Sequence, residues 1–209
     1  FGAGAFLAVS QGNGTRDAGI VRLAYRPRGA GAPAVSLVGK GICFDSGGTT
    51  LKAHKGTPHM HTDMEGSAVA VGSLYALHAV RSPAAVDCWL AITENRIGPL
   101  AYKPQDVVRA QNGTTIQVIH TDAEGRMVLA DALHYAATRF KPACIIDLAT
   151  LTYAVMAAVG GAYSGIFCNQ ERLYKDLVAA GETTGERLWR LPLDGYYDEN
   201  LESPIADFR

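Results

Sequence analysis

Short runs of apolar residues alternate along the chain with longer segments whose apolar residues are spaced as in a helix. The short runs, rich in Val, Ile and Leu, predict strands, most of them buried on both faces. We expect strands at residues 20–25, 34–39, 42–44, 86–92, 115–119, 143–148 and 166–168. We expect helices at residues 64–80, 127–139, 153–159 and 171–180. This alternation indicates an α/β fold with a mixed, largely parallel β-sheet and helices on both faces.

The ends of several elements carry their own signals. Asn112-Gly113 favours a hairpin turn before the run at 115–119. Gly181 is expected to end the last helix as its C′ residue. Residues 1–10 fit either a short helix or a strand, and a Gly-rich turn follows them. The sequence contains no internal repeat, so we expect one compact domain.

The composition suits a globular domain with a sizeable core, since 48% of the 209 residues are hydrophobic and 19% are charged. The net charge of −1 argues against binding to nucleic acid or to an anionic membrane. No apolar run is long enough to cross a bilayer, and we expect no membrane association. The four cysteines form no C-x-x-C pair and suit buried thiols in a reducing compartment. We therefore expect a cytoplasmic protein.

Carboxylates gather at three places where a strand ends or a helix begins, which is the usual location of a site in an α/β sheet. The residues are Asp45, Asp63, Asp122 and Glu124. Four carboxylates brought together repel one another unless cations hold them. Oxygen-rich groups of this kind suit Mg, Mn or Zn, and two neighbouring metals that share carboxylates commonly serve hydrolysis by water.

Each of these residues also has an ordinary structural explanation. Thr121 or Asp122 would cap the helix that follows, and Glu124 would stabilise its first turn. Asp63 would cap the helix at 64–80. The two interpretations differ in whether the carboxylates converge in three dimensions.

Other chemistries fit the sequence poorly. The Gly-rich segment at 39–41 lacks the Ser or Thr of a P-loop. Residues 44–48 do not form a G-x-S-x-G elbow, which argues against a serine hydrolase. The spacing of His54, His59 and His61 fits no closed zinc site, and we expect these residues to line or flank a pocket.

Three motifs together resemble the signatures of the leucyl (cytosol) aminopeptidase family. Residues 38–48, with 51–52 and 63–64, resemble its first signature; residues 121–131 resemble the second and residues 147–152 a third. Their order and spacing agree over nearly the whole chain. The resemblance implies that residues 1–209 are a metallo-aminopeptidase catalytic domain, incomplete at its C-terminal end and without the family's N-terminal domain.

The resemblance also implies a site for two divalent metal ions, Zn or Mn with Mg as a further candidate. Lys40, Asp45, Asp63 and Glu124 would hold the tighter metal. Asp45, Asp122 and Glu124 would hold the second, more exchangeable one. Lys40 would bind as a neutral amine, which requires burial beside divalent cations to depress its pKa. A water that bridges the metals would be the nucleophile attacking the N-terminal peptide bond.

Further roles follow from the same resemblance. Lys52 would polarise the scissile carbonyl and stabilise the oxyanion. Arg126 would hold a bicarbonate ion that acts as general base, unless it pairs with a carboxylate on its own helix. Four residues would contact the substrate: Met60, Thr150, Leu151 and Tyr153. Tyr153 stands where the family commonly has Gly, so its ring would reshape the specificity pocket. A dipeptidase with narrow specificity therefore remains a further alternative.

Peptide substrates and a homo-hexamer with active sites facing an inner cavity complete what the resemblance implies. The alternative is a non-catalytic hexameric scaffold or a DNA-associated relative. Such relatives tend to lose a metal-binding carboxylate or the lysine at the position of Lys52. Because this chain keeps all of them, the sequence favours the enzyme.

Overall fold

The structure is a computed structural model that describes residues 2–15 and 17–209. The chain forms two compact units, Phe1–Leu151 with Ser203–Arg209 and Thr152–Glu202. Among the described residues, no helix has the length and apolar character needed to cross a membrane.

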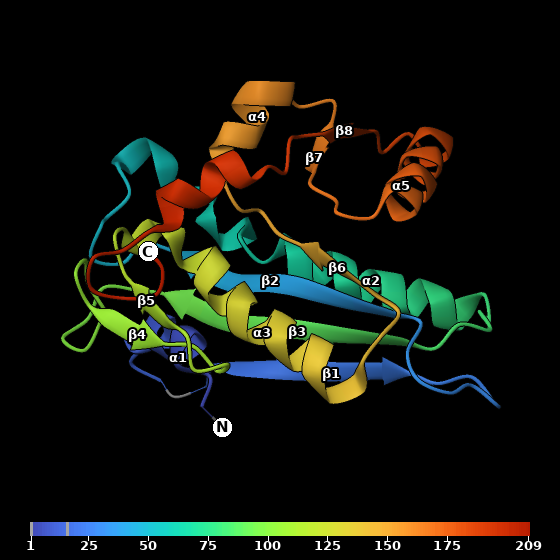
Figure 1. The fold of residues 1–209 in the computed structure, drawn as a ribbon, viewed down its shortest axis with the longest axis horizontal. Coiled ribbons are helices and arrows are strands. Elements are labelled where there is room, and N and C mark those ends of the chain that lie inside the picture. The colour runs from blue at the N-terminus through green and yellow to red at the C-terminus, as the bar shows by residue number, and fades with distance from the viewer. Residues whose placement is uncertain (1, 16) are drawn as a thin grey trace. The chain divides into compact units, whose positions relative to one another are not determined.

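A four-stranded sheet forms the centre of the first unit (Figure 1). In spatial order its strands are β1 (Gly19–Tyr25), β3 (Val86–Asn95), β2 (Val35–Asp45) and β6 (Cys144–Leu148). β3, β2 and β6 run parallel to one another, whereas β1 pairs antiparallel with β3 at the edge. The predicted mixed, largely parallel sheet is confirmed.

Helices cover both faces of this sheet, as predicted (Figure 1). α2 (Glu65–Ala79) packs on one face, and α1 (Gly4–Ser10) and α3 (Glu124–Phe140) pack on the other. Successive residues of β3 point to opposite faces, so Cys88 joins the α2 side of the core and Trp89 joins the α3 side. Burial on both faces explains the nearly continuous apolar sequence of this strand.

β2 is one continuous strand, although the sequence predicts two shorter ones. It passes through Lys40, whose charge is compensated by partners outside the sheet, and its register with β3 becomes irregular between Ile42 and Asp45. Gly39 allows the close approach of α2, because a Cβ at this position would lie 2.6 Å from the Cα of Ser67. After the irregular stretch, Asp45 ends β2 directly opposite Asn95 at the end of β3.

A small hairpin and three short 3-10 helices complete the first unit. β4 (Val107–Arg109) pairs antiparallel with β5 (Thr115–Gln117), and Gly113 in the connecting turn has a φ of 91°, which confirms the predicted turn. The 3-10 helices are η1 (His54–Gly56), η2 (Met60–Thr62) and η3 (Thr121–Ala123). η3 runs directly into α3, and η2 ends two residues before α2 begins.

The second unit consists of short elements around a two-stranded parallel sheet. They are α4 (Tyr153–Val159), β7 (Ser164–Ile166), α5 (Glu171–Thr184), β8 (Leu188–Arg190) and η4 (Gly195–Leu201). The sequence did not predict β8, and β7 lies two residues before the predicted strand at 166–168. The predicted helix end at Gly181 is wrong: α5 continues to Thr184, and the left-handed residue at its end is Gly185, with a φ of 82°.

The cysteines are all free, but the prediction that they are buried holds only for Cys88. Cys43 is exposed, and Cys144 and Cys168 are half-buried. Cys43 and Cys144 belong to apolar runs, yet each lies near a strand end.

Candidate metal centre

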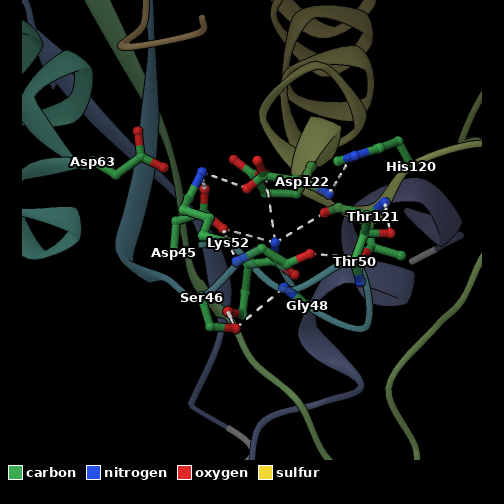
Figure 2. A network of polar contacts seen from close by, with 12 residues as sticks. Asp45, Ser46, Gly48, Thr50, Lys52, Asp63, His120, Thr121 and Asp122 are labelled. Atoms are coloured by element: carbon green, nitrogen blue, oxygen red, sulfur yellow. Dashed lines mark hydrogen bonds and ion pairs between the residues drawn. The ribbon is translucent and has the colours of Figure 1, made fainter. Parts of the chain in front are cut away.

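Four carboxylates and two lysines converge where β2 ends and α3 begins. We call them the carboxylate–lysine cluster: Lys40, Asp45, Lys52, Asp63, Asp122 and Glu124. Figure 2 labels three of the carboxylates and one of the lysines. β2 supplies Lys40 and Asp45, and the loop after it supplies Lys52. Asp63 directly follows η2, Asp122 lies within η3 and Glu124 begins α3. The convergence predicted from the positions of strand and helix ends is therefore present.

Lys40 lies between two carboxylates and is only 2% exposed. Its Nζ atom lies 2.8 Å from Asp63 and 2.9 Å from Glu124, and it donates to the Thr150 carbonyl oxygen at 2.9 Å. Gly125 leaves room for this lysine, since a Cβ there would lie 2.9 Å from the Cε atom of Lys40.

Lys52 joins the other two carboxylates. Its Nζ atom lies 2.8 Å from Asp45 Oδ2 and forms a second ion pair with Asp122 (Figure 2). Asp122 is the more open partner, with its side chain 24% exposed against 3% for Asp45. Lys52 and Asp122 therefore form the solvent-facing side of the cluster, and Lys40 forms the buried side.

The ion pairs raise the pKa of both lysines. Burial alone would lower the pKa of Lys40, but the carboxylates of Glu124 and Asp63 outweigh burial and raise it. Burial would also lower the pKa of Lys52, but its hydrogen bonds to Asp122 and Asp45 outweigh burial and raise this pKa as well. Without bound cations, both lysines are ammonium ions at neutral pH.

The carboxylates are left with an excess of negative charge. Burial, the largest cause, raises the pKa of Asp63, Asp122 and Glu124 above its ordinary value. The negative charge of Asp45 contributes to each of these increases. Two ammonium groups thus compensate four buried or half-buried carboxylates incompletely.

This donor set fits divalent cations. Asp45, Asp122 and Glu124 each offer an oxygen atom within 4.8 Å of the others, which matches the ligand set expected for the exchangeable metal. Asp63 is not in that group of three and is connected to Glu124 through Lys40. A cation held by Lys40 would have to displace a proton from its amine, because only the neutral amine has a lone pair to donate.

The capping explanations of these residues are wrong. The N-cap residue of α3 is Ala123, and that of α2 is Met64; neither helix has a side-chain cap. Thr121 is fully buried, where it accepts a hydrogen bond from Thr50 N at 2.8 Å and donates to Gly47 O at 2.6 Å. Glu124 does open α3, as predicted, but its side chain is 1% exposed and faces Lys40.

The remaining predicted residues lie at different distances from the cluster. Thr150 donates from Oγ1 to Asp63 at 2.7 Å, and the Leu151 side chain packs over Gly125. Met60 is buried in η2, next to the turn that carries Asp63. Arg126 is exposed in the first turn of α3 and forms no ion pair within the described part of the chain.

Two sets of predicted residues do not join the cluster within the first unit. Tyr153 begins α4 in the second unit and is 60% exposed, so its place in a substrate pocket stays a prediction. His54, His59 and His61 are exposed and belong to no potential metal-binding group of the described residues.

Sequence reasoning missed two buried polar residues behind the carboxylates, Asn95 and Tyr102. Asn95 Nδ2 donates to Asp45 Oδ1 at 2.8 Å and to Thr121 O at 2.9 Å, and the Tyr102 hydroxyl donates to Thr121 O at 2.9 Å. Asn95 could have been found, because it ends β3 at the same sheet edge as Asp45. Tyr102 follows in an irregular segment with no comparable signal.

The fold and the cluster define a class: an α/β protein with a carboxylate-rich candidate metal centre at the carboxyl ends of its parallel strands. The sequence model of the cytosol aminopeptidase family, catalytic domain, matches residues 1–209. The chain belongs to this family, as the resemblance of its motifs implied.

Individual relatives agree with this membership. The chain is 48% identical over 203 residues to the probable cytosol aminopeptidase of Geobacter sulfurreducens, covering 97% of this chain and 40% of that protein. It is 43% identical over 206 residues to the probable cytosol aminopeptidase of Chlorobaculum tepidum, covering 99% and 41%. This chain therefore spans about two fifths of the length of the curated relatives it matches.

The fold agrees with a solved structure of a related enzyme. The bottromycin maturation enzyme BotP in complex with Mn superposes with a TM-score of 0.91 at 39% sequence identity. The match covers 99% of this chain and 45% of the BotP chain.

Proposed function

We propose that this chain carries the metal centre of a metal-dependent aminopeptidase that hydrolyses the N-terminal bond of peptides. The observation that carries the proposal is the convergence of Lys40, Asp45, Asp63, Asp122 and Glu124 at one sheet edge. Family membership and the Mn found in the BotP structure support the assignment. We assign residues 1–209 to the catalytic domain on the same grounds.

Two overlapping ligand sets would hold two divalent ions, Zn or Mn with Mg as a further candidate. Lys40, Asp45, Asp63 and Glu124 form one set, and Asp45, Asp122 and Glu124 form the other. When bound, such ions would activate a water as the nucleophile and polarise the scissile carbonyl.

The chain's own residues would then handle charge and protons. Lys52 is a cation with its side chain 11% exposed, on the open side of the cluster, where an ammonium group would stabilise an oxyanion. Its raised pKa keeps it protonated throughout the neutral range. Arg126, exposed in the first turn of α3, would hold a bicarbonate ion that acts as general base.

The substrate would lie against the segments that flank the cluster. Thr150 and Leu151 follow the end of β6, and both contact cluster residues or their immediate neighbours. Met60 precedes Asp63 in the chain. These residues would select the N-terminal side chain and bind the peptide backbone. We propose Tyr153 as a further substrate contact on the resemblance to the family alone.

The alternative function, a non-catalytic scaffold or DNA-associated protein, has weaker support. The cluster is complete, and the net charge of −1 offers no electrostatic attraction for DNA. By analogy with the family, we further propose a homo-hexamer located in the cytoplasm, consistent with relatives named cytosol aminopeptidases. Light scattering on the purified protein would test the assembly.

Release of free amino acids from a panel of N-terminal amino-acid amides tests the proposed activity. The full-length protein is incubated with Mn or Zn, or with a chelator. We expect release of at least one residue type that depends on the metal and stops with the chelator. No metal-dependent release from any member of the panel would overturn the proposed activity.

A further inference from the structure

Behind the carboxylates, on the side away from the lysines, lies a buried amide. Asn95 is fully buried at the end of β3, and its Nδ2 group faces three oxygen atoms. These are Asp45 Oδ1 at 2.8 Å, Thr121 O at 2.9 Å and Glu124 Oε2 at 3.4 Å. An amide nitrogen has two hydrogen atoms, so the two shorter contacts are its main hydrogen bonds and the third is the weakest.

Asn95 determines which oxygen of Asp45 is available to the site. Asp45 Oδ1 accepts hydrogen bonds from Asn95 Nδ2 at 2.8 Å and from Gly47 N at 2.9 Å. The other oxygen, Oδ2, faces Lys52 at 2.8 Å. With one oxygen engaged by two neutral donors, the carboxylate cannot rotate without losing both bonds.

The same amide fixes the backbone that leads into Asp122. The Thr121 carbonyl oxygen accepts from Asn95 Nδ2 and from the Tyr102 hydroxyl, each at 2.9 Å, so both of its lone pairs are engaged. This carbonyl belongs to the peptide bond between Thr121 and Asp122. Tyr102 is 3% exposed, and its ring packs in the main hydrophobic core, which holds the hydroxyl in place.

Because Asn95 carries no charge, it holds these oxygens together without competing with a cation for the cluster. Without it, Asp45 Oδ1 would keep only the hydrogen bond from Gly47 N, the Thr121 carbonyl only that from Tyr102, and Glu124 Oε2 would lose its contact with the amide. We propose that Asn95, assisted by Tyr102, is a positioning residue that orients Asp45, the backbone entering Asp122 and Glu124 for divalent metal binding. This inference rests on the proposed metal centre.

Direct measurement of Mn²⁺ affinity tests the inference without relying on activity. The full-length protein is stripped of metal and titrated with Mn²⁺, and the free ion is followed by electron paramagnetic resonance. Asn95→Leu removes the donor at similar size and should weaken Mn²⁺ binding by about 10- to 100-fold. Tyr102→Phe keeps the ring in the core and removes one of the two donors to Thr121, and should weaken binding by about 5-fold.

Thr93→Val provides the matched control. Thr93 is 3% exposed in the same strand, two residues before Asn95, and bonds to Asn13 and Glu94 rather than to the cluster. This variant should lose stability but keep its Mn²⁺ affinity within about 2-fold. The comparison separates positioning from a general loss of stability, and circular dichroism of the metal-free proteins establishes that each variant is folded.

The outcomes distinguish this inference from the proposed function. If the natural protein binds Mn²⁺ and folded Asn95→Leu binds it equally well, the positioning role is overturned while the metal centre stands. If Asn95→Leu does not fold, unchanged affinity in Tyr102→Phe overturns it instead. If the natural protein binds no divalent ion, the metal centre itself fails.

Discussion

Lys40→Met removes a buried ammonium group from between two carboxylates while keeping a side chain of similar length. In the metal-free protein, Asp63 and Glu124, which are 5% and 1% exposed, would then face each other without a compensating charge. Removing one member of a buried ion pair costs about 3–5 kcal/mol. For a chain of this size, that loss should lower the melting temperature by about 6–20 °C.

The loss should also depend on pH. Asp63 and Glu124 have raised pKa values, so the folded state binds their protons more tightly than the unfolded state, and acidification through the raised values stabilises the fold. Removing Lys40 takes away the charge that opposes this increase. The deficit of Lys40→Met should therefore be largest near about pH 8 and shrink toward about pH 5. In the natural protein, Lys40 remains charged throughout, because its pKa is raised above 10.5.

Thermal unfolding of the metal-free proteins, followed by circular dichroism at both pH values, measures these differences. Lys103→Met is the control, since Lys103 pairs with Asp106 at 3.0 Å but its side chain is 66% exposed. The control should change stability by less than about 1 kcal/mol. If Lys40→Met behaves like the control, or loses the same stability at both pH values, Lys40 is not the buried counter-ion described above.

Three further outcomes are expected. Lys52→Met should still bind Mn²⁺ but should lower the turnover number for amino-acid release by about 100-fold or more, because it removes the oxyanion-stabilising cation; unchanged turnover would exclude that role. Gly39→Ala should lower the free energy of unfolding by about 1–3 kcal/mol in chemical denaturation, because its Cβ would lie 2.6 Å from the Ser67 Cα atom. Gly14→Ala, with no atom within 4 Å of its Cβ, should leave the free energy of unfolding unchanged. Mn²⁺ affinity should fall on acidification, because three cluster carboxylates have raised pKa values and protons bound to them compete with the ion. Calorimetry in buffers of different ionisation enthalpy should detect proton release when Mn²⁺ binds. Binding without proton release would contradict this competition.

The central strands β2 and β3 could be predicted because they are covered on both faces. Burial of both faces makes β3 and the start of β2 almost continuously apolar, and such runs are visible in the sequence. The continuation of β2 through Lys40 was not predictable in this way, because a charged residue is buried only when distant partners compensate it. Those partners, Asp63 and Glu124, come from segments far along the chain.

The candidate site could be predicted in outline for a topological reason. Carboxyl ends of parallel strands meet at one edge, so carboxylates placed at those ends converge. Which oxygen each carboxylate offers was not predictable, because it depends on neutral donors such as Asn95 and Tyr102 behind them. The end of α5 was misplaced for a local reason. Two glycines, Gly181 and Gly185, lie near the end of this helix, and only the backbone conformation identifies Gly185 as the residue that ends it.

Metal stoichiometry of the full-length protein, measured by elemental analysis after equilibration with Mn²⁺ and removal of unbound ion, tests the central claim most directly. The natural protein should retain two equivalents of Mn²⁺ per chain, because every residue of both proposed ligand sets is present. Glu124 belongs to both sets. Glu124→Ala should lose one or both equivalents and release no amino acids from the amide panel. Full metal content and full activity in Glu124→Ala would contradict the metal centre proposed for this chain.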